Sequence, residues 1–200
     1  MRGGSDAIHR VVEHQSVVSA DAQAIRHGAE AMSYRDLNQR ANALARRLMS
    51  AGLRRGSHVV ARLDRSPELV ITLLAVLKTG SAYTWNAAGG GPATIWAAGD
   101  LTLNSRYERV DVGGLDTCPL AASPNLPVLV RGGDVACLLL TPGNTSLAIS
   151  HEDVIGARDA TGPSVEWARS AVANPVALWS TLMAGGTLHL PESSSLRTAA

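Results

Sequence analysis

The chain has 200 residues, and its 18 basic and 17 acidic side chains leave a formal net charge of +1. This length is typical of one domain with its own hydrophobic core, and the charge balance argues against a nucleic-acid or polyanion binder. Lys78 is the only lysine among the basic residues, so chemistry that needs two lysines within this sequence is excluded.

The first 32 residues predict a helix followed by a short extended pair. Asp6 can cap a helix that runs from Ala7 to about Gln15. Residues 24–27 are expected to be extended, to turn at Gly28 and to return through residues 31–32.

The next helix carries the clearest start and stop signals of the sequence. Ser33 occupies the cap position and Asp36 follows three residues later, as in a shortened capping box. Gly52 ends the helix. The apolar residues that recur at helical spacing and form one buried stripe are Leu37, Ala41, Leu44, Ala45, Leu48 and Met49.

A strand, a helix and a second strand follow in quick succession. Residues 58–63 predict a buried strand, and Ser66 with a proline after it opens a helix that stops at Gly80. Residues 81–85 predict the second strand. This βαβ spacing favours an α/β fold with a mostly parallel sheet flanked by helices.

The second half of the sequence carries weaker signals, and the path of residues 89–127 stays open. We expect Ser150 to cap a helix that begins near Glu152. The remaining expectations are short strands at 101–103 and 109–112, a loop at 115–127, an apolar strand at 135–140, an amphipathic stretch at 165–183 broken at 174–175, a strand at 187–190 and a frayed tail at 193–200.

The cysteine and histidine patterns do not indicate a metal site. Cys118 and Cys137 are 19 positions apart and are expected to be reduced. The histidines at positions 9, 14, 27, 58, 151 and 189 are scattered, so surface or lightly buried positions are expected. No signal peptide is apparent, and the nine-residue aliphatic run at 69–77 is too short to span a bilayer. We expect a soluble, cytoplasmic protein with no membrane partner.

Three segments of the sequence carry recognisable motifs. Residues 32–37 read M-S-Y-R-D-L, residues 77–83 read L-K-T-G-S-A-Y, and a third segment lies at 177–188. They resemble the first core motif (L-[TS]-Y-x-E-L), the second (L-K-A-G-x-A-Y) and the end of the fourth motif of the adenylation domains of nonribosomal peptide synthetases, in the adenylate-forming superfamily. The resemblance implies a partial N-terminal subdomain of that fold over residues 1–192, best matched at 7–85 and degenerate at 86–192, with 193–200 as a disordered tail.

The resemblance also places a phosphate-binding loop, Y-T-S-G-T-T-G-x-P-K-G, after the strand at 135–140. Thr141, Gly143 and Thr145 align with positions of this loop. Pro142 replaces a serine and has no N–H to donate to a phosphate, and Ser146 replaces a glycine. The P-K-G-V segment is missing, so the loop is vestigial.

Other positions to which the family assigns a role are also changed. Val172 aligns with the aspartate that pairs with the amino group of the substrate, and valine cannot neutralise a buried ammonium. Lys78 belongs to the second motif, at a helix C-terminus where a cation favours the helix dipole. No lysine is left for the loop or for the role that the family gives to its C-terminal subdomain, which this sequence does not include.

These observations predict a non-catalytic protein with no catalytic residue, no cofactor and no metal. We expect it to act in a nonribosomal peptide pathway as a scaffold, regulator or recruiter, in contact with a synthetase or tailoring enzyme or with a second copy of itself. Three alternatives stay open: half of a split adenylating enzyme completed in trans, a repurposed small-molecule-binding enzyme, and a decayed gene product. Trp85, Trp96, Trp167 and Trp179 are candidates for a contact surface, with core packing favoured for Trp179.

Overall fold

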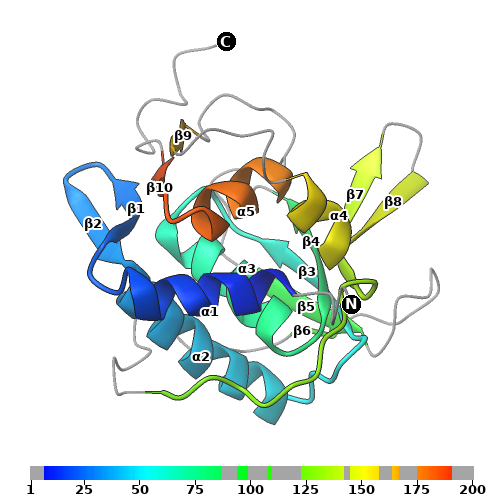
Figure 1. Ribbon diagram of the computed structural model, residues 1–200. Coiled ribbons are helices and arrows are strands. Elements are labelled where there is room, and N and C mark those ends of the chain that lie inside the picture. Colours follow the sequence, from blue (N-terminus) through cyan, green and yellow to red (C-terminus); the bar gives the residue numbers. More distant parts are fainter. Residues whose placement is uncertain are drawn as a thin grey trace, which may run out of the picture.

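A computed structural model shows an α/β protein (Figure 1). It describes residues 7–86, 94–98, 108–109, 123–141, 145–157, 164–166 and 175–190. Several predicted features lie outside the described residues: the Asp6 cap, the strand at 101–103, Cys118 and the tail at 193–200. In the part of the chain that is described, no helix is long and apolar enough to span a membrane.

Two sheets and five helices make up the described fold. Sheet A has the order β2 (Glu30–Ser33), β1 (Gln23–His27), β10 (Thr187–Leu190), β9 (Ser164–Glu166). Sheet B has the order β6 (Glu108–Arg109), β5 (Thr94–Ala98), β3 (His58–Arg62), β4 (Ala82–Asn86), β7 (Val135–Thr141), β8 (Thr145–Ser150). The helices are α1 (Ile8–Val18), α2 (Tyr34–Ser50), α3 (Pro67–Lys78), α4 (His151–Gly156) and α5 (Pro175–Met183).

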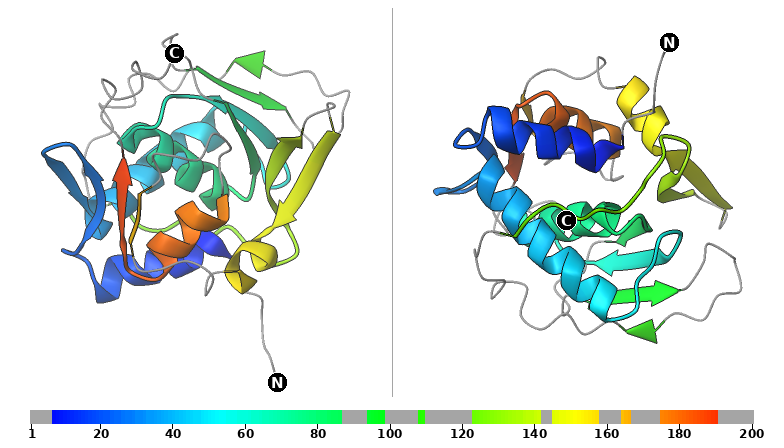
Figure 2. Two further views of the ribbon diagram at one scale, coloured as in Figure 1. Left: turned by 90° about the horizontal axis from the view of Figure 1, so that it is seen from above. Right: turned by 60° about the horizontal axis from the view of Figure 1, so that its bottom comes forward.

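The helices α1, α2, α3 and α5 lie between the two sheets (Figures 1 and 2). α3 packs on β3 and β4 of sheet B, whereas α5 packs on β9 and β10 of sheet A. α2 contacts α3 on one side and β1 and β2 on the other, so the helical layer joins the sheets.

The α/β class is confirmed, and both sheets are mixed. The predicted βαβ unit forms as expected, with β3 and β4 parallel and α3 between them. β7 continues the parallel pairing next to β4, whereas β5, β6 and β8 add antiparallel pairs on both sides. β7 and β8 are joined by only three residues, the kind of short connection that an antiparallel pair allows.

The serine caps and the glycines that end the helices of the first half lie where the sequence predicts them. The Ser33 side chain accepts a hydrogen bond from the Asp36 N–H at the start of α2, and Ser66 accepts one from the Leu69 N–H at the start of α3. Gly52 and Gly80 follow the two helices with φ of +104° and +76°, the left-handed region that glycine adopts at little cost.

Three strands were not predicted. In the sequence β5 and β8 are flanked by residues typical of turns, and their pairing with β3 and β7 supplies the stability that local propensity lacks. β9 lies at the start of the predicted amphipathic stretch at 165–183, where residues 164–166 pair in parallel with β10. Residues 167–174 lie outside the described residues, and the helix that follows begins at Pro175.

Sheet A brings the two ends of the described chain together. β10 pairs in parallel with β1, with Leu188 opposite Ile25. The Tyr34 hydroxyl, from the first motif, lies 3.0 Å from the Leu182 carbonyl oxygen and 2.7 Å from that of Gly186. The first motif is therefore held directly against the segment that ends the fourth motif.

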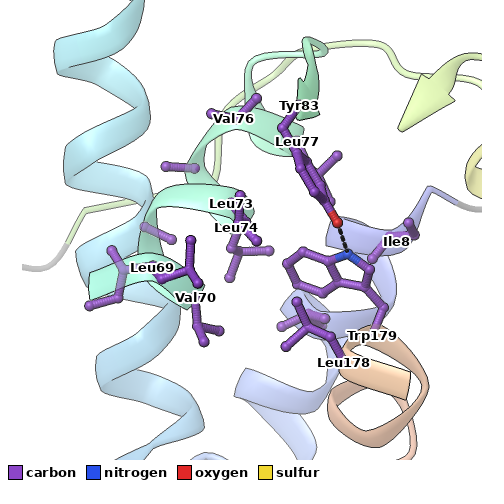
Figure 3. Packing of buried hydrophobic residues seen from close by; sticks show 14 of the residues in the cluster. Ile8, Leu69, Val70, Leu73, Leu74, Val76, Leu77, Tyr83, Leu178 and Trp179 are labelled. Atoms are coloured by element: carbon purple, nitrogen blue, oxygen red, sulfur yellow. Dashed lines mark hydrogen bonds between the residues drawn. The ribbon is translucent and has the colours of Figure 1, made fainter. Parts of the chain in front are cut away.

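The core lies where α3, α5 and β4 meet. Trp179 is fully buried, as predicted, and its Nε1 donates a 2.8 Å hydrogen bond to the Tyr83 hydroxyl (Figure 3). Ile8 from α1 and Leu74 from α3 belong to the same cluster. Trp85 is half-buried, donates to the Leu63 carbonyl oxygen at 2.7 Å and packs under the Arg65 guanidinium, so it does not form an open contact surface.

Candidate functional site

The predicted phosphate-loop positions lie at the tip of the β7–β8 hairpin. β7 has Cys137 opposite Tyr83 of β4, and β8 runs back along its other side. Thr141 and Thr145 form the last pair of the hairpin. Residues 142–144 alone connect the two strands.

Two of the four vestigial positions, Thr141 and Thr145, therefore face each other as strand partners. Gly143 and Val172 lie outside the described residues. A phosphate cradle needs several consecutive backbone N–H groups that no strand partner uses. In a three-residue connection that contains Pro142, at most two residues have an N–H to offer.

Lys78, the last residue of α3, is buried in an ion pair. Its Nζ donates to Glu13 Oε1 of α1 at 2.5 Å, and its side chain has no exposed surface. Glu13 Oε2 also accepts from Arg10 Nη1 at 3.0 Å. Burial lowers the pKa of Lys78 to about 8, although the Glu13 carboxylate opposes the shift. The only lysine of the chain thus joins α3 to α1 and does not face solvent.

Two buried histidines lie close to this ion pair. The rings of His9 and His151 meet edge to face, with centroids 6.1 Å apart, and each residue is 1% exposed. His151 Nδ1 accepts a hydrogen bond from the Ile8 N–H at 3.2 Å. Ala7 provides no side-chain cap for α1. His151 of α4, 143 positions away in the sequence, instead accepts a hydrogen bond from a backbone N–H in the first turn of α1.

Burial keeps both rings neutral at neutral pH. Burial, together with the nearby Lys78 charge, lowers the pKa of His9 to about 2. Burial also lowers the pKa of His151 to about 4, with the Asp134 carboxylate acting in the opposite direction. Neither ring is poised to exchange protons near pH 7, so the pair is suited to packing and capping and not to acid–base catalysis.

The prediction of surface or lightly buried histidines is wrong for three of the six. His9, His58 and His151 are all buried. His58 lies on β3, with its Nε2 2.9 Å from Thr84 Oγ1 on the neighbouring strand. A signal for His58 was present, because strands of a parallel sheet covered on both faces are buried on both sides.

The structure offers no metal centre in its described part. No group of three His, Cys, Asp or Glu side chains among those residues is placed to hold a metal ion. Cys137 is a free thiol, and burial raises its pKa to about 12, so it is not a reactive nucleophile. The Ser150 cap is confirmed and forms a full capping box with Asp153 at the start of α4.

A comparison with protein families identifies the family of the first half of the chain. Residues 12–95, which contain the first two motifs, match the family model described as AMP-binding enzyme. The N-terminal part of the chain belongs to the AMP-binding enzyme family. This range overlaps residues 7–85, the segment predicted from the motifs as the best match.

The curated relatives of this adenylation-domain-like chain are peptide synthetases. Tyrocidine synthase 3 of Brevibacillus parabrevis is 43% identical over 171 residues, which cover 76% of this chain and 3% of that protein. Surfactin synthase subunit 2 of Bacillus subtilis (strain 168) is 42% identical over 167 residues, 74% of this chain and 5% of that protein. Bacitracin synthase 1 of Bacillus licheniformis is 30% identical over 154 residues, with 69% and 3% covered. The chain therefore spans a few per cent of the length of these relatives.

Solved structures confirm the fold. The N-terminal subdomain of Klebsiella oxytoca NpsA in space group C2 superposes with a TM-score of 0.74 at 21% identity, over 96% of this chain and 58% of that one. The same subdomain in complex with 3-hydroxybenzoyl-AMSN gives a TM-score of 0.72 at 24% identity, with 95% and 56% covered. The chain thus has the α/β architecture of part of an adenylation N-terminal subdomain.

Proposed function

We propose that the chain is a non-catalytic, adenylation-domain-like protein of a nonribosomal peptide pathway that acts through contacts with other proteins. The observation that carries the proposal is the three-residue connection between β7 and β8, with Thr141 paired to Thr145. At most two of its three residues have an N–H, since one is Pro142, so the connection makes a poor site for a nucleoside triphosphate.

The position of Lys78 supports the same proposal. A phosphate cradle is completed by a cation that reaches the phosphate oxygens. Lys78 is the only lysine of this sequence, and its ammonium is held by Glu13 with no exposed surface. No lysine of this chain is therefore free to neutralise a phosphate at the hairpin.

The proposed partners follow from the relatives. Tyrocidine, surfactin and bacitracin synthases each contain a segment similar in sequence to this chain. We therefore propose a synthetase or a tailoring enzyme of the same pathway as the partner, with this chain acting as its scaffold, regulator or recruiter. We propose that the protein acts in the cytoplasm.

Half of a split adenylating enzyme is the second candidate. The observation that favours it is the alignment of 96% of this chain with 58% of a solved N-terminal subdomain, because the fold itself is retained. In this case a partner chain would have to provide the nucleotide site in trans.

Amino-acid-dependent ATP–pyrophosphate exchange tests the proposal. The chain is assayed alone and with each protein encoded by the neighbouring genes, against all proteinogenic amino acids and aryl acids, with an active adenylation domain as positive control. We expect no exchange above the blank and no retention of a fluorescent ATP analogue. Exchange by the chain alone would refute the proposal, and exchange that appears only with a neighbour would establish the split enzyme.

A further inference from the structure

β8 forms one open edge of sheet B. Its only strand partner among the described residues is β7, and in Figures 1 and 2 it is the outermost strand beyond β7. The strand has six residues, Thr145–Ser150, and none of them is charged. Leu147 is 56% exposed and the neighbouring Ala148 is also exposed. An uncharged edge with exposed apolar side chains is a template for pairing with another strand.

The other three sheet edges carry features that discourage such pairing. β6 consists of two residues, both charged. β2 has four residues and begins with the exposed Glu30. β9 has three residues and ends with Glu166. Short length and charge are the usual means by which proteins protect edge strands, and β8 alone of the four edges lacks both.

We propose that β8 is the surface through which two copies of this chain associate, by antiparallel pairing of β8 with β8 of the second copy. This dimer rests on the proposed function through protein contacts, and the partner at this surface is a second copy of the chain. Pairing about a two-fold axis at Leu147 sets Leu147 of one copy opposite Leu147 of the other, and it places the same strand on both sides of the interface, as a closed dimer requires.

The charges at the ends of β8 favour this occupant and this direction. Glu152 and Asp153 follow the strand and are the exposed acidic residues at one end, whereas the sequence Pro142-Gly143-Asn144 at the other end is uncharged. Antiparallel pairing sets the acidic end of each copy beside the uncharged end of the other. Parallel pairing would set the acidic ends side by side and bring like charges together.

The dimer would join the two six-stranded sheets into one continuous sheet of twelve strands. A six-residue strand is about 20 Å long, so the paired edge is a small interface. Small interfaces give transient association in about the micromolar range, and the dimer is therefore expected to depend on concentration.

Light scattering coupled to size-exclusion chromatography tests the proposal on the 200-residue chain. The unchanged chain is loaded over about a hundredfold range of concentration around the micromolar range expected for a small interface. We expect the mass to rise from monomer towards dimer. Leu147→Lys brings two cations together at the axis and is expected to weaken dimerisation at least about tenfold. Val17→Lys on α1 is the matched control, because Val17 is 75% exposed and its helix is not part of the edge.

Hydrogen exchange locates the interface independently. The amides of β8 are expected to become more protected as the concentration rises in the unchanged chain and in Val17→Lys, and to stay unchanged in Leu147→Lys. A monomer at all concentrations, or a dimer that Leu147→Lys leaves intact, would overturn the β8 proposal. Neither result bears on pyrophosphate exchange, so the proposed loss of catalysis stands or falls separately.

Discussion

The buried ion pair between Lys78 and Glu13 makes the stability of this protein depend on pH in a specific way. The Lys78 pKa is about 8 in the folded chain and 10.5 is its ordinary value. Between these values the unfolded chain binds more protons than the folded chain, so the free energy of unfolding rises as the pH is raised from 8 to 10.5. Below pH 8 the folded chain carries a charged, buried ammonium that Glu13 neutralises.

Glu13→Gln removes the neutralising charge and keeps the shape. The Lys78 pKa then falls further. The resulting loss in the free energy of unfolding is limited, because the ammonium can release its proton. One pKa unit corresponds to 1.36 kcal/mol, so the cost has a ceiling of about 1.4 kcal/mol at pH 7 and about 2.7 kcal/mol at pH 6. Above pH 9 Lys78 is neutral in both proteins and the cost from this source is close to zero.

Urea unfolding followed by tryptophan fluorescence at pH 6, 7 and 9 and constant ionic strength measures these costs. The control is Glu13→Gln in a Lys78→Met background, where the cost should lose its dependence on pH, and the difference is a double-mutant cycle. An equal cost of Glu13→Gln at pH 6 and pH 9 would refute the assignment of Lys78 as a charged group that Glu13 holds.

Three further predictions concern the residues around the core. His9 and His151 have folded pKa values of about 2 and 4, below their ordinary 6.5, so together they stabilise the fold above pH 6.5 and lose about 4 kcal/mol of this stabilisation as the pH falls to 4.5. His9→Leu should halve this dependence of the free energy of unfolding on pH, measured from urea midpoints. An unchanged dependence on pH would contradict the prediction. Tyr34→Phe removes the hydroxyl that lies within hydrogen-bond distance of the Leu182 and Gly186 carbonyl oxygens and should cost about 1–3 kcal/mol in the same assay, with a cost near zero as the contrary result. Gly80→Ala adds a side chain at φ +76°, 3.0 Å from Arg55 Cγ, and should cost at least about 1 kcal/mol; Gly156→Ala meets no atom within 4 Å and should be neutral, so equal effects would refute the backbone argument.

The first half of the fold could be predicted because its signals are local. Ser33 and Ser66 start their helices, Gly52 and Gly80 end them, and the apolar spacing between these residues fixes which face is buried. The second half depends on pairing between distant segments. β5 becomes a strand because β3 lies beside it, and β10 is joined to β1 across most of the chain. A single sequence does not display such pairings.

The candidate site was predictable in part for the same reason. The shortened loop was visible as a missing segment, and the three-residue connection between Thr141 and Thr145 fits it. The environment of Lys78 was not visible, since its partner Glu13 is 65 positions away and the helical pattern alone places a cation at the α3 terminus. The buried histidine pair was missed because His9 and His151 meet through packing of α1 against α4.

The parallel pairing of Ile25 with Leu188 has a consequence for synthesis of the chain. The two partners are separated by 163 positions, and ribosomes add about 5–20 residues per second. The β1–β2 hairpin therefore waits roughly 10–30 s for its neighbour β10, and through that interval one edge of β1 has no strand beside it. Newly made chains would need a chaperone, or rapid dilution from one another, during this wait more than at any later time.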